Sequence, residues 1–530
     1  MVGADSEEHY VARIQEVYEG FPAVGNVFLA DKEKPYGAAG LGEIVVAWIG
    51  KVLGMSAVEV NVFSKFLFPF LIVLLIYALV YSLIGFKSSA LIAAAAPILG
   101  YNLISETDSW LALLRGEAID NLFLVFARPI NPEVSSICLF AVLLLVYRGF
   151  YLRSAPRLWE IIAVDAFTCS YLYISPYVFS FLGLLLLVSC LWFLYRRDYR
   201  LAVRMFAAGA LALILLIPFL VNYFSLHESL DYAAFAMRTG VVTKHVFLLG
   251  FWIPLMALAV FFLWPKEHTQ ARIFLLTVFF AIFLVINQQV LTGLYLHPGH
   301  YHWYITKPLV AIMVGIYAGL VLENFFRSTR LYSILFAAGM GVLFYNAALW
   351  QITSYTQVYP VALAAQSYAP VFTYLNSLPD TQTIWTNDRL SLYIPMYTQH
   401  NTPSNHYVIY YLNPHEFYEK RAFLMYRLKG VTPTTILETM KQDRNDLSQR
   451  LFGMFIREDT GIPDAISEET FLDLEKKYKT FYARPYAEVF KDLGITMLLA
   501  PREERANYET ISALVPESAL GDYLVYTLRP

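Results

Sequence analysis

The stretch NVFSKFLFPFLIVLLIYALVYSLI (Asn61–Ile84) decides the fold class of this chain. A run of about 20 mainly apolar residues is long enough to cross a hydrocarbon layer about 30 Å thick. Similar runs recur along the 530 residues, of which 58% are apolar and 15% charged, with a mean hydropathy of +0.50. Soluble domains contain about 45–50% apolar and about 25% charged residues. The chain is therefore predicted to be a multi-spanning membrane protein.

The apolar runs predict ten membrane spans. They cover 61–84, 88–104, 133–150, 157–172, 175–195, 202–222, 245–264, 270–290, 304–323 and 330–350. Beyond residue 353 no run is long enough to span. There TIWTND (383–388) and ITMLLAP (495–501) predict buried strands, and PHEFYEKRAFLMYRL (414–428) predicts an amphipathic helix. We predict a mainly α fold, a polytopic transmembrane helical bundle over 61–353, followed by a C-terminal α/β domain over 354–530.

Basic residues concentrate on alternate connections between the predicted spans. One set of connections carries Lys87, Arg148, Arg153, Arg157, Arg196, Arg197, Arg200, Arg204, Lys266, Arg272, Arg327 and Arg330. The other set carries only Arg115, Arg128, Arg238 and Lys244. Lys and Arg accumulate in cytoplasmic loops, so the second set faces outward. Residues 1–60 and the 354–530 domain are then both extracytoplasmic, at a plasma (inner) membrane.

Residues 1–60 form the first outer loop in this topology. A polar segment of this length needs a preceding element to lead it across the membrane. We expect a transmembrane helix upstream of Met1; the alternative is that span 61–84 inserts as a reversed anchor. Segments 41–54 and 105–133 show apolar residues at helical spacing and are expected to lie along the membrane interface.

Polarity is concentrated in the outer loops, and the spans are mostly apolar. Pores and carriers place polar groups within the membrane, and carriers usually show paired halves and interrupted helices. The sequence shows neither paired halves nor interrupted helices. A site beneath outer loops and above apolar helices suits a substrate with a lipid tail and a polar head. The sequence contains no basic tract that would indicate a nucleic-acid partner.

Three stretches resemble a known family. They are DSEEHYVARIQEVYEGFPAVGN (5–26), FARPINPEVS (126–135) and NQQVLTGLYLHPGHYHWY (287–304). With the predicted topology they resemble the GT-C superfamily of membrane glycosyltransferases, in particular uncharacterised bacterial members. The resemblance implies inverting transfer of a sugar from a polyprenyl-phosphate carrier to a glycan, lipid or protein acceptor on the outer face. The alternatives are a transporter or flippase of lipid-linked glycans and a non-catalytic scaffold.

The resemblance implies catalytic acids in the first outer loop. Asp5, Glu7 and Glu8 occupy that place, and a carboxylate can take the proton of an acceptor hydroxyl. If this segment is helical, Asp5, Glu8 and His9 share one face, a set suited to a divalent cation such as Mg²⁺ or Mn²⁺. The alternative is a solvated helix start whose acids interact favourably with the helix N-terminus.

Three further acids are candidate functional residues, and each could have a structural role instead. Family members carry a further acid in a later outer loop, which predicts a role for Glu106 and Asp108. These two residues could equally cap the helix that follows them. Asp165 lies deep in a predicted span, so we hypothesise a functional role for it. The alternative is that Asp165 is a structural acid, hydrogen-bonded between helices.

A leaving lipid phosphate requires cations and hydrogen-bond donors. Arg128, Arg238, His300 and Lys307 are predicted to bind the donor phosphate. An arginine can grip phosphate oxygens with two hydrogen bonds, and a lysine acts as a point charge. The alternatives are basic side chains that reach lipid headgroups and, around His300, an interfacial aromatic belt.

Overall fold

The computed structural model describes most of the chain. The described residues are 7–23, 25–33, 35–37, 40–105, 107–117, 124–128, 130–170, 173–239, 242–296, 298–326, 330–386, 388–453 and 466–529. They fall into two compact units. Unit 1 comprises 1–7, 41–220 and 243–360, and unit 2 comprises 8–40, 221–242 and 361–530. The predicted domains follow one another along the chain, whereas these units interleave, because segments 8–40 and 221–242 group with the C-terminal part.

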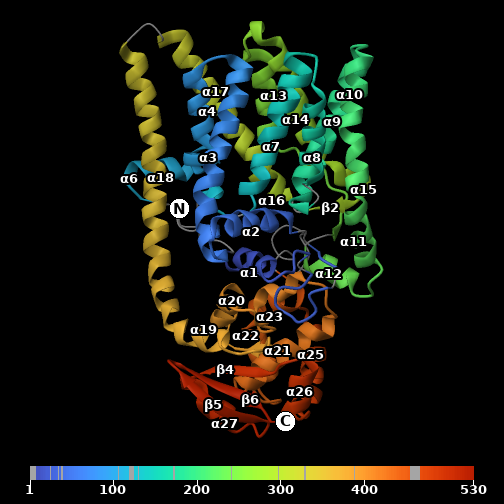
Figure 1. Cartoon of the computed structure of the whole chain (residues 1–530), viewed down its shortest axis with the longest axis vertical. Coiled ribbons are helices and arrows are strands. Elements are labelled where there is room, and N and C mark those ends of the chain that lie inside the picture. The colour runs from blue at the N-terminus through green and yellow to red at the C-terminus, as the bar shows by residue number, and fades with distance from the viewer. Residues whose placement is uncertain are drawn as a thin grey trace. The chain divides into compact units, whose positions relative to one another are not determined.

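Unit 2 mixes helices and strands (Figure 1). Its elements are α12 (Tyr232–Arg238), η7 (Gln366–Tyr368), α19 (Ala369–Asn376), β3 (Ile384–Trp385), α20 (Asp388–Tyr397), η8 (His406–Tyr410), α21 (His415–Leu428), α22 (Ile436–Gln442), α23 (Arg444–Phe452), α25 (Glu468–Tyr482), α26 (Tyr486–Asp492), β4 (Met497–Pro501), η9 (Arg502–Glu504), α27 (Arg505–Glu509), β5 (Leu514–Leu520) and β6 (Tyr523–Leu528). Four further elements continue from one unit into the other: α1 (Glu7–Tyr18), α11 (Ile217–His227), β1 (Val242–Thr243) and α18 (Arg330–Ala365).

The sheet of unit 2 has four strands in the order β3-β4-β6-β5. β3 and β4 are parallel, with Ile384 opposite Met497, and β6 is antiparallel to both of its neighbours. Ile384, Leu499 and Val525 are buried in one apolar cluster with residues of α19 and α20. The predicted strands therefore correspond to β3 and β4, and the predicted helix 414–428 corresponds to α21. These elements confirm the α/β character of the C-terminal part.

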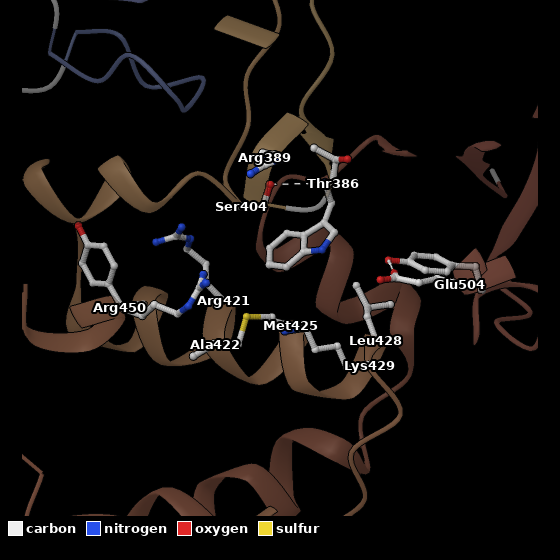
Figure 2. A pocket seen from close by; sticks show the side chains of 13 residues that line it. Thr386, Arg389, Ser404, Arg421, Ala422, Met425, Leu428, Lys429, Arg450 and Glu504 are labelled. Atoms are coloured by element: carbon white, nitrogen blue, oxygen red, sulfur yellow. Dashed lines mark hydrogen bonds between the residues drawn. The ribbon is translucent and has the colours of Figure 1, made fainter. Parts of the chain in front are cut away.

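A cavity of about 320 Å³ opens in unit 2 where β3 and β4 end (Figure 2). Trp385 and Thr386 line it from the end of β3, and Glu504 lines it from η9, which directly follows β4. Helix α21 contributes Arg421 and Met425. In open α/β sheets, ligands commonly bind outside the carboxyl ends of neighbouring parallel strands.

Among its described residues, the secondary structure of unit 1 is helical apart from β2 and the last residue of β1. Its elements are α2 (Leu41–Leu53), α3 (Ala57–Ile84), α4 (Lys87–Leu99), α5 (Tyr101–Ser105), α6 (Thr107–Arg115), η1 (Val125–Ala127), α7 (Glu133–Val146), η2 (Tyr147–Leu152), α8 (Leu158–Ser170), α9 (Pro176–Tyr195), α10 (Tyr199–Leu215), α13 (Trp252–Leu263), η4 (Lys266–His268), α14 (Thr269–Val285), α15 (Gln288–Thr292), β2 (Leu294–Tyr295), α16 (Pro298–Tyr301), η5 (His302–Thr306), α17 (Lys307–Val321) and η6 (Leu322–Phe326).

Six helical stretches among the described residues are long and apolar enough to cross a membrane. They are Ala57–Ile84, Glu133–Leu152, Pro176–Tyr195, Lys266–Thr292, Pro298–Phe326 and Arg330–Asn376. The chain is thus a multi-pass membrane protein with a mainly helical fold, as predicted. The other four predicted spans correspond to shorter helices. Span 88–104 divides at Gly100 into α4 and α5, and span 202–222 divides between α10 and α11, next to Pro218.

Local signals fix the ends of the longest apolar helix of the N-terminal half, α3. Ser56 caps its start, because the Ser56 hydroxyl accepts from the Glu59 amide while the Glu59 carboxylate accepts from the Ser56 amide. Gly85 ends the helix with φ 75°, a left-handed conformation in which glycine has no side chain to clash. Its amide donates to the Tyr81 carbonyl. The span 61–84 is therefore a helix with defined ends.

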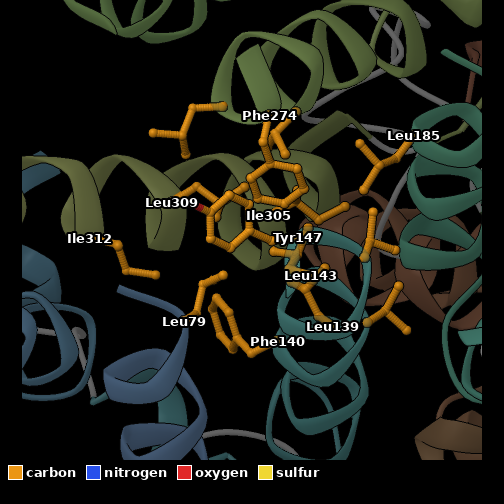
Figure 3. Packing of buried hydrophobic residues seen from close by; sticks show 14 of the residues in the cluster. Leu79, Leu139, Phe140, Leu143, Tyr147, Leu185, Phe274, Ile305, Leu309 and Ile312 are labelled. Carbon is orange, nitrogen blue, oxygen red and sulfur yellow. The ribbon is translucent and has the colours of Figure 1, made fainter. Parts of the chain in front are cut away.

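The core of unit 1 is one large apolar cluster (Figure 3). Tyr147 of η2 packs against Phe274 of α14, with ring centroids 5.2 Å apart, and Phe140 of α7 lies beside Leu79 of α3. Small residues bring two of the helices close together. A Cβ at Gly319 of α17 would lie 2.5 Å from the Ser89 Cα of α4. Such close backbone approach is typical of helix packing in membranes, where dispersion contacts replace the hydrophobic effect.

Candidate functional site

Residues 298–307 of unit 1 carry two of the four predicted phosphate-binding side chains, those of His300 and Lys307. The segment runs from α16 through η5 into α17, and η5 is a π-helical turn. π-helical turns are rare, and they occur often at functional sites because they displace side chains from the regular helical positions. In this protein the turn carries Trp303 and Tyr304 between His300 and Lys307. The local backbone thus presents two cationic or titratable groups and two aromatic rings together.

Arg128 reaches this segment from a distant part of the chain. It lies between η1 and α7, and its Nη1 donates to the Tyr304 hydroxyl at 2.5 Å. His300 stacks on Tyr177 of α9, with ring centroids 4.5 Å apart, and lies 5.3 Å from the Tyr304 ring. Tyr304 therefore joins Arg128 and His300, two residues that are far apart in sequence.

Lys307 is enclosed by aromatic rings. Its residue is 3% exposed, and its Nζ lies 4.1 Å from the Tyr101 ring centroid and 4.0 Å from the Trp303 ring centroid. The Tyr101 hydroxyl donates to the Trp303 carbonyl at 2.6 Å. Cation–π attraction of this kind is worth about 2 kcal/mol when the site is desolvated. The ammonium therefore holds both rings in a fixed arrangement.

A second charged cluster links the start of α3 to the start of α7. The Lys65 Nζ lies 2.5 Å from Oε1 of Glu7, and the Ser64 hydroxyl donates to Glu133 Oε2 at 3.3 Å. Glu133 is fully buried and Lys65 is nearly so, whereas the Glu7 side chain is 27% exposed. Glu7 is thus a partly accessible carboxylate that is positioned by a buried lysine.

Sequence reasoning missed Lys65, Glu133 and the aromatic partners Tyr177 and Tyr304. A signal for the first two was present. Lys65 lies within the predicted span 61–84 and Glu133 begins the predicted span 133–150, and ionisable residues in spans are rare and usually functional or paired. The aromatic partners carry no comparable signal, because the chain contains 38 tyrosines.

The remaining predicted acids differ in their position in the fold. Asp5 and Glu106 lie outside the described residues. Asp108 is exposed in the first turn of α6. Glu8 belongs to unit 2, unlike Glu7, although the two are adjacent in sequence. Asp165 is fully buried in α8, and its functional role stays a hypothesis.

His9 belongs to an aromatic cluster of unit 2. Its Nε2 is 3.1 Å from the Tyr411 hydroxyl, and its ring stacks on Tyr407 with centroids 4.9 Å apart. Among the described residues, no group of three or more His, Cys, Asp or Glu is arranged to hold a metal ion. Because Asp5 lies outside those residues, a divalent cation held by Asp5, Glu8 and His9 stays a prediction.

Arg238 is buried and belongs to unit 2, whereas Arg128, His300 and Lys307 belong to unit 1. Its Nη2 donates to the Asn413 carbonyl at 3.1 Å, and its guanidinium carbon lies 4.2 Å from the Tyr418 ring centroid. Burial lowers the pKa of Arg238, against the effect of the neighbouring Tyr418 and Asp231. The Nε and Nη1 of Arg238 are buried without a hydrogen-bond partner among the described residues, and its role in binding the donor phosphate stays a prediction.

No protein-family model and no curated protein matches this chain. Solved structures are similar to it over nearly its whole length. ArnT from Cupriavidus metallidurans has 13% identity and a TM-score of 0.43, covering 99% of this chain and 93% of its own in the apo state, or 94% when bound to undecaprenyl phosphate. The archaeal oligosaccharyltransferase AglB from Archaeoglobus fulgidus, in complex with an inhibitory peptide and a dolichol-phosphate, has 13% identity and a TM-score of 0.40, covering 100% of this chain and 71% of its own.

These similarities are weak both in sequence and in structure. With 13% identity and TM-scores below 0.5, they transfer no activity, substrate or residue role to this chain.

Proposed function

We propose that this chain is an integral membrane glycosyltransferase that moves a sugar from a polyprenyl-phosphate carrier to an acceptor at the outer face of the membrane. One observation carries the proposal: in a unit built from membrane-spanning helices, Arg128 and His300 meet at Tyr304, next to the ring-enclosed Lys307. A phosphate joined to a hydrocarbon tail needs such a combination of cation, hydrogen-bond donor and aromatic surface.

Arg128 is assigned to the donor phosphate. Its side chain is half-buried, which weakens competition from water and strengthens a charge-assisted hydrogen bond. A guanidinium offers N–H groups in a planar fork that matches the oxygens of a phosphate. The imidazole of His300 is held flat against Tyr177 and is a candidate for the same phosphate or for a sugar hydroxyl. We assign two roles to Lys307. It fixes the rings of Trp303 and Tyr101, and it adds positive charge behind them.

A carboxylate in segment 5–8 is assigned as the general base. Glu7 is the described member of this segment that belongs to unit 1, and Lys65 fixes its position. In an inverting transfer, the acceptor oxygen attacks the anomeric carbon and its proton passes to the carboxylate. The bond between the anomeric carbon and the phosphate oxygen breaks at the same time, and the lipid phosphate leaves with that electron pair.

The test separates donor binding from chemistry. Purified full-length protein is assayed for binding of undecaprenyl phosphate and for transfer from a panel of undecaprenyl-phosphate sugars to lipid extracts. We expect Arg128→Gln to weaken lipid-phosphate binding about tenfold or more, because a charge-assisted contact is lost. Arg115→Gln is the matched control, since Arg115 is an exposed arginine of α6. Equal binding by both variants would overturn the assignment of Arg128.

The catalytic part of the proposal is tested in the same assays. Glu7→Gln should retain lipid-phosphate binding but lose transfer by about 100-fold or more, as is typical when a general base is removed. Glu117→Gln, an exposed acid after α6, is the control. A flippase would move the lipid across a bilayer without transfer and would be indifferent to Glu7→Gln. That result would replace the transferase proposal.

A further inference from the structure

The cavity of unit 2 combines cationic side chains with an apolar wall. Arg389, Arg421 and Arg450 line it, and Trp385 and Met425 supply buried apolar surface. These residues come from β3, α20, α21 and α23, so the cavity is enclosed by separate elements of one unit. Its volume of about 320 Å³ falls within the range of small-molecule sites, about 300–1,000 Å³.

Arg421 is the fixed cation of the cavity. The residue is 7% exposed, and its guanidinium donates to two backbone carbonyls, those of Pro403 and of Asn405, the latter at 2.6 Å. Both acceptors are backbone carbonyls, so these bonds hold the guanidinium in a fixed orientation. A buried and oriented arginine is suited to recognise a phosphate or a carboxylate, because its N–H groups match the geometry of those anions.

The charges are distributed unevenly along the cavity. Figure 2 shows Arg421 and Arg450 toward one end, and Glu504 with Lys429 toward the other. Arg450 is tied to Asp446 at 2.7 Å on its own helix, and the Tyr508 hydroxyl donates to Glu504 at 3.4 Å. A ligand that matches this pattern carries an anionic group at one end and hydroxyl donors at the other.

The middle of the cavity fits the body of a sugar. Trp385 offers an aromatic face, and the hydrogen-bearing faces of pyranose rings pack well on aromatic rings. The Ser404 hydroxyl accepts from the Thr386 amide at 3.4 Å, which leaves its own O–H as a donor. The middle of the cavity thus offers a sugar ring both an apolar face and a hydrogen-bond donor.

We propose that this cavity binds a small anionic saccharide, a monosaccharide that carries a phosphate or a carboxylate. The anion contacts Arg421, with Arg389 and Arg450 beside it, the ring lies on Trp385, and a hydroxyl donates to Glu504. The position at the carboxyl ends of two parallel strands agrees with the place where α/β sheets bind ligands. This inference concerns unit 2 alone and does not depend on the proposed transfer reaction.

The experiment uses the full chain in detergent and isothermal titration calorimetry at low ionic strength. Glucose 1-phosphate and glucuronate are the two anionic probes, and glucose and inorganic phosphate are the comparison ligands. We expect at least one anionic sugar to bind at least about tenfold more tightly than glucose or inorganic phosphate. Failure of both anionic sugars to bind overturns the proposal. Equal binding of glucose overturns the anion-binding part, and equal binding of inorganic phosphate overturns the saccharide part.

The site is located by substituting two of the cations that line the cavity, Arg389 and Arg450. Arg389→Gln and Arg450→Gln should each weaken binding of the anionic sugar about tenfold. Arg502→Gln is the matched control, because Arg502 is exposed on η9, two residues before Glu504, and does not line the cavity. Melting temperatures without ligand show that each variant is folded. Equal affinities for wild type, Arg389→Gln and Arg450→Gln would place the ligand elsewhere.

Discussion

Lys307 of unit 1 and Arg238 of unit 2 are both buried cations over aromatic rings, but their surroundings differ. Lys307 lies between Tyr101 and Trp303, on the segment that also carries His300 and the Arg128 partner Tyr304. Arg238 has a backbone acceptor, the Asn413 carbonyl, and one ring, that of Tyr418. A close backbone contact adjoins it, since a Cβ at Gly453 would lie 2.4 Å from the Arg238 carbonyl oxygen.

The comparison shows that burial of a cation does not identify its role. Around Lys307 the neighbouring groups are further donors and rings that a substrate could use. Around Arg238 they are one backbone carbonyl and one ring, while its Nε and Nη1 are buried without a hydrogen-bond partner in the part of the chain that the structure describes. A structural role for Arg238 is therefore a hypothesis that a substitution can test. Two carboxylate–lysine pairs differ in the same way. Glu7 with Lys65 in unit 1 keeps a partly exposed carboxylate, whereas Glu16 with Lys32 in unit 2 is buried.

The largest effect expected from this contrast is on stability at Arg238. Arg238→Ala should lower the free energy of unfolding by about 4 kcal/mol, because it leaves a cavity in unit 2 and removes the hydrogen bond to the Asn413 carbonyl. Arg238→Met should recover most of this loss by filling the volume. Melting temperatures and limited proteolysis of the full chain report both. If Arg238→Met weakened undecaprenyl-phosphate binding in a folded protein, the structural assignment would be wrong.

The buried pair of unit 2 should make its stability depend on pH. Burial raises the pKa of Glu16 to about 7, although Lys32 opposes this. The folded state therefore holds a proton that the unfolded state releases near pH 4.5, and stability falls as the pH rises from about 4.5 to about 7. The loss is on the order of 3 kcal/mol. Melting curves over this pH range should show the decline in wild type and a weaker one in Glu16→Gln; an identical decline in the variant would contradict the assignment.

The smallest of these effects is expected at Lys307. Lys307→Met keeps the length of the side chain and removes the charge between the two rings. We expect undecaprenyl-phosphate affinity to fall about tenfold, or ~1.4 kcal/mol, with little change in melting temperature. Lipid binding by the purified variant is compared with that of Arg238→Met. Unchanged affinity in Lys307→Met would reduce Lys307 to the same structural role as Arg238.

Much of the fold was predictable because membrane insertion and strand burial impose patterns on consecutive residues. The apolar runs predicted helices at all ten places, and the short apolar segments at 383–388 and 495–501 predicted β3 and β4. The number of helices long enough to span was not predictable in this way. Mean hydropathy does not register the breaks at Gly100 or next to Pro218, where the backbone leaves the helical path.

The sequence by itself determined that the chain is a multi-pass membrane protein with an α/β tail, and it identified Arg128, His300 and Lys307 as related candidates. Only the tertiary structure decided which partners they have: Tyr304 for Arg128, Tyr177 for His300, and two rings for Lys307. Only it assigned Arg238 to a different unit and formed the unit 2 cavity from β3, α20, α21, α23, η9 and α27. The physical reason is that hydropathy acts on neighbouring residues, whereas a site depends on contacts between side chains that chain folding brings together.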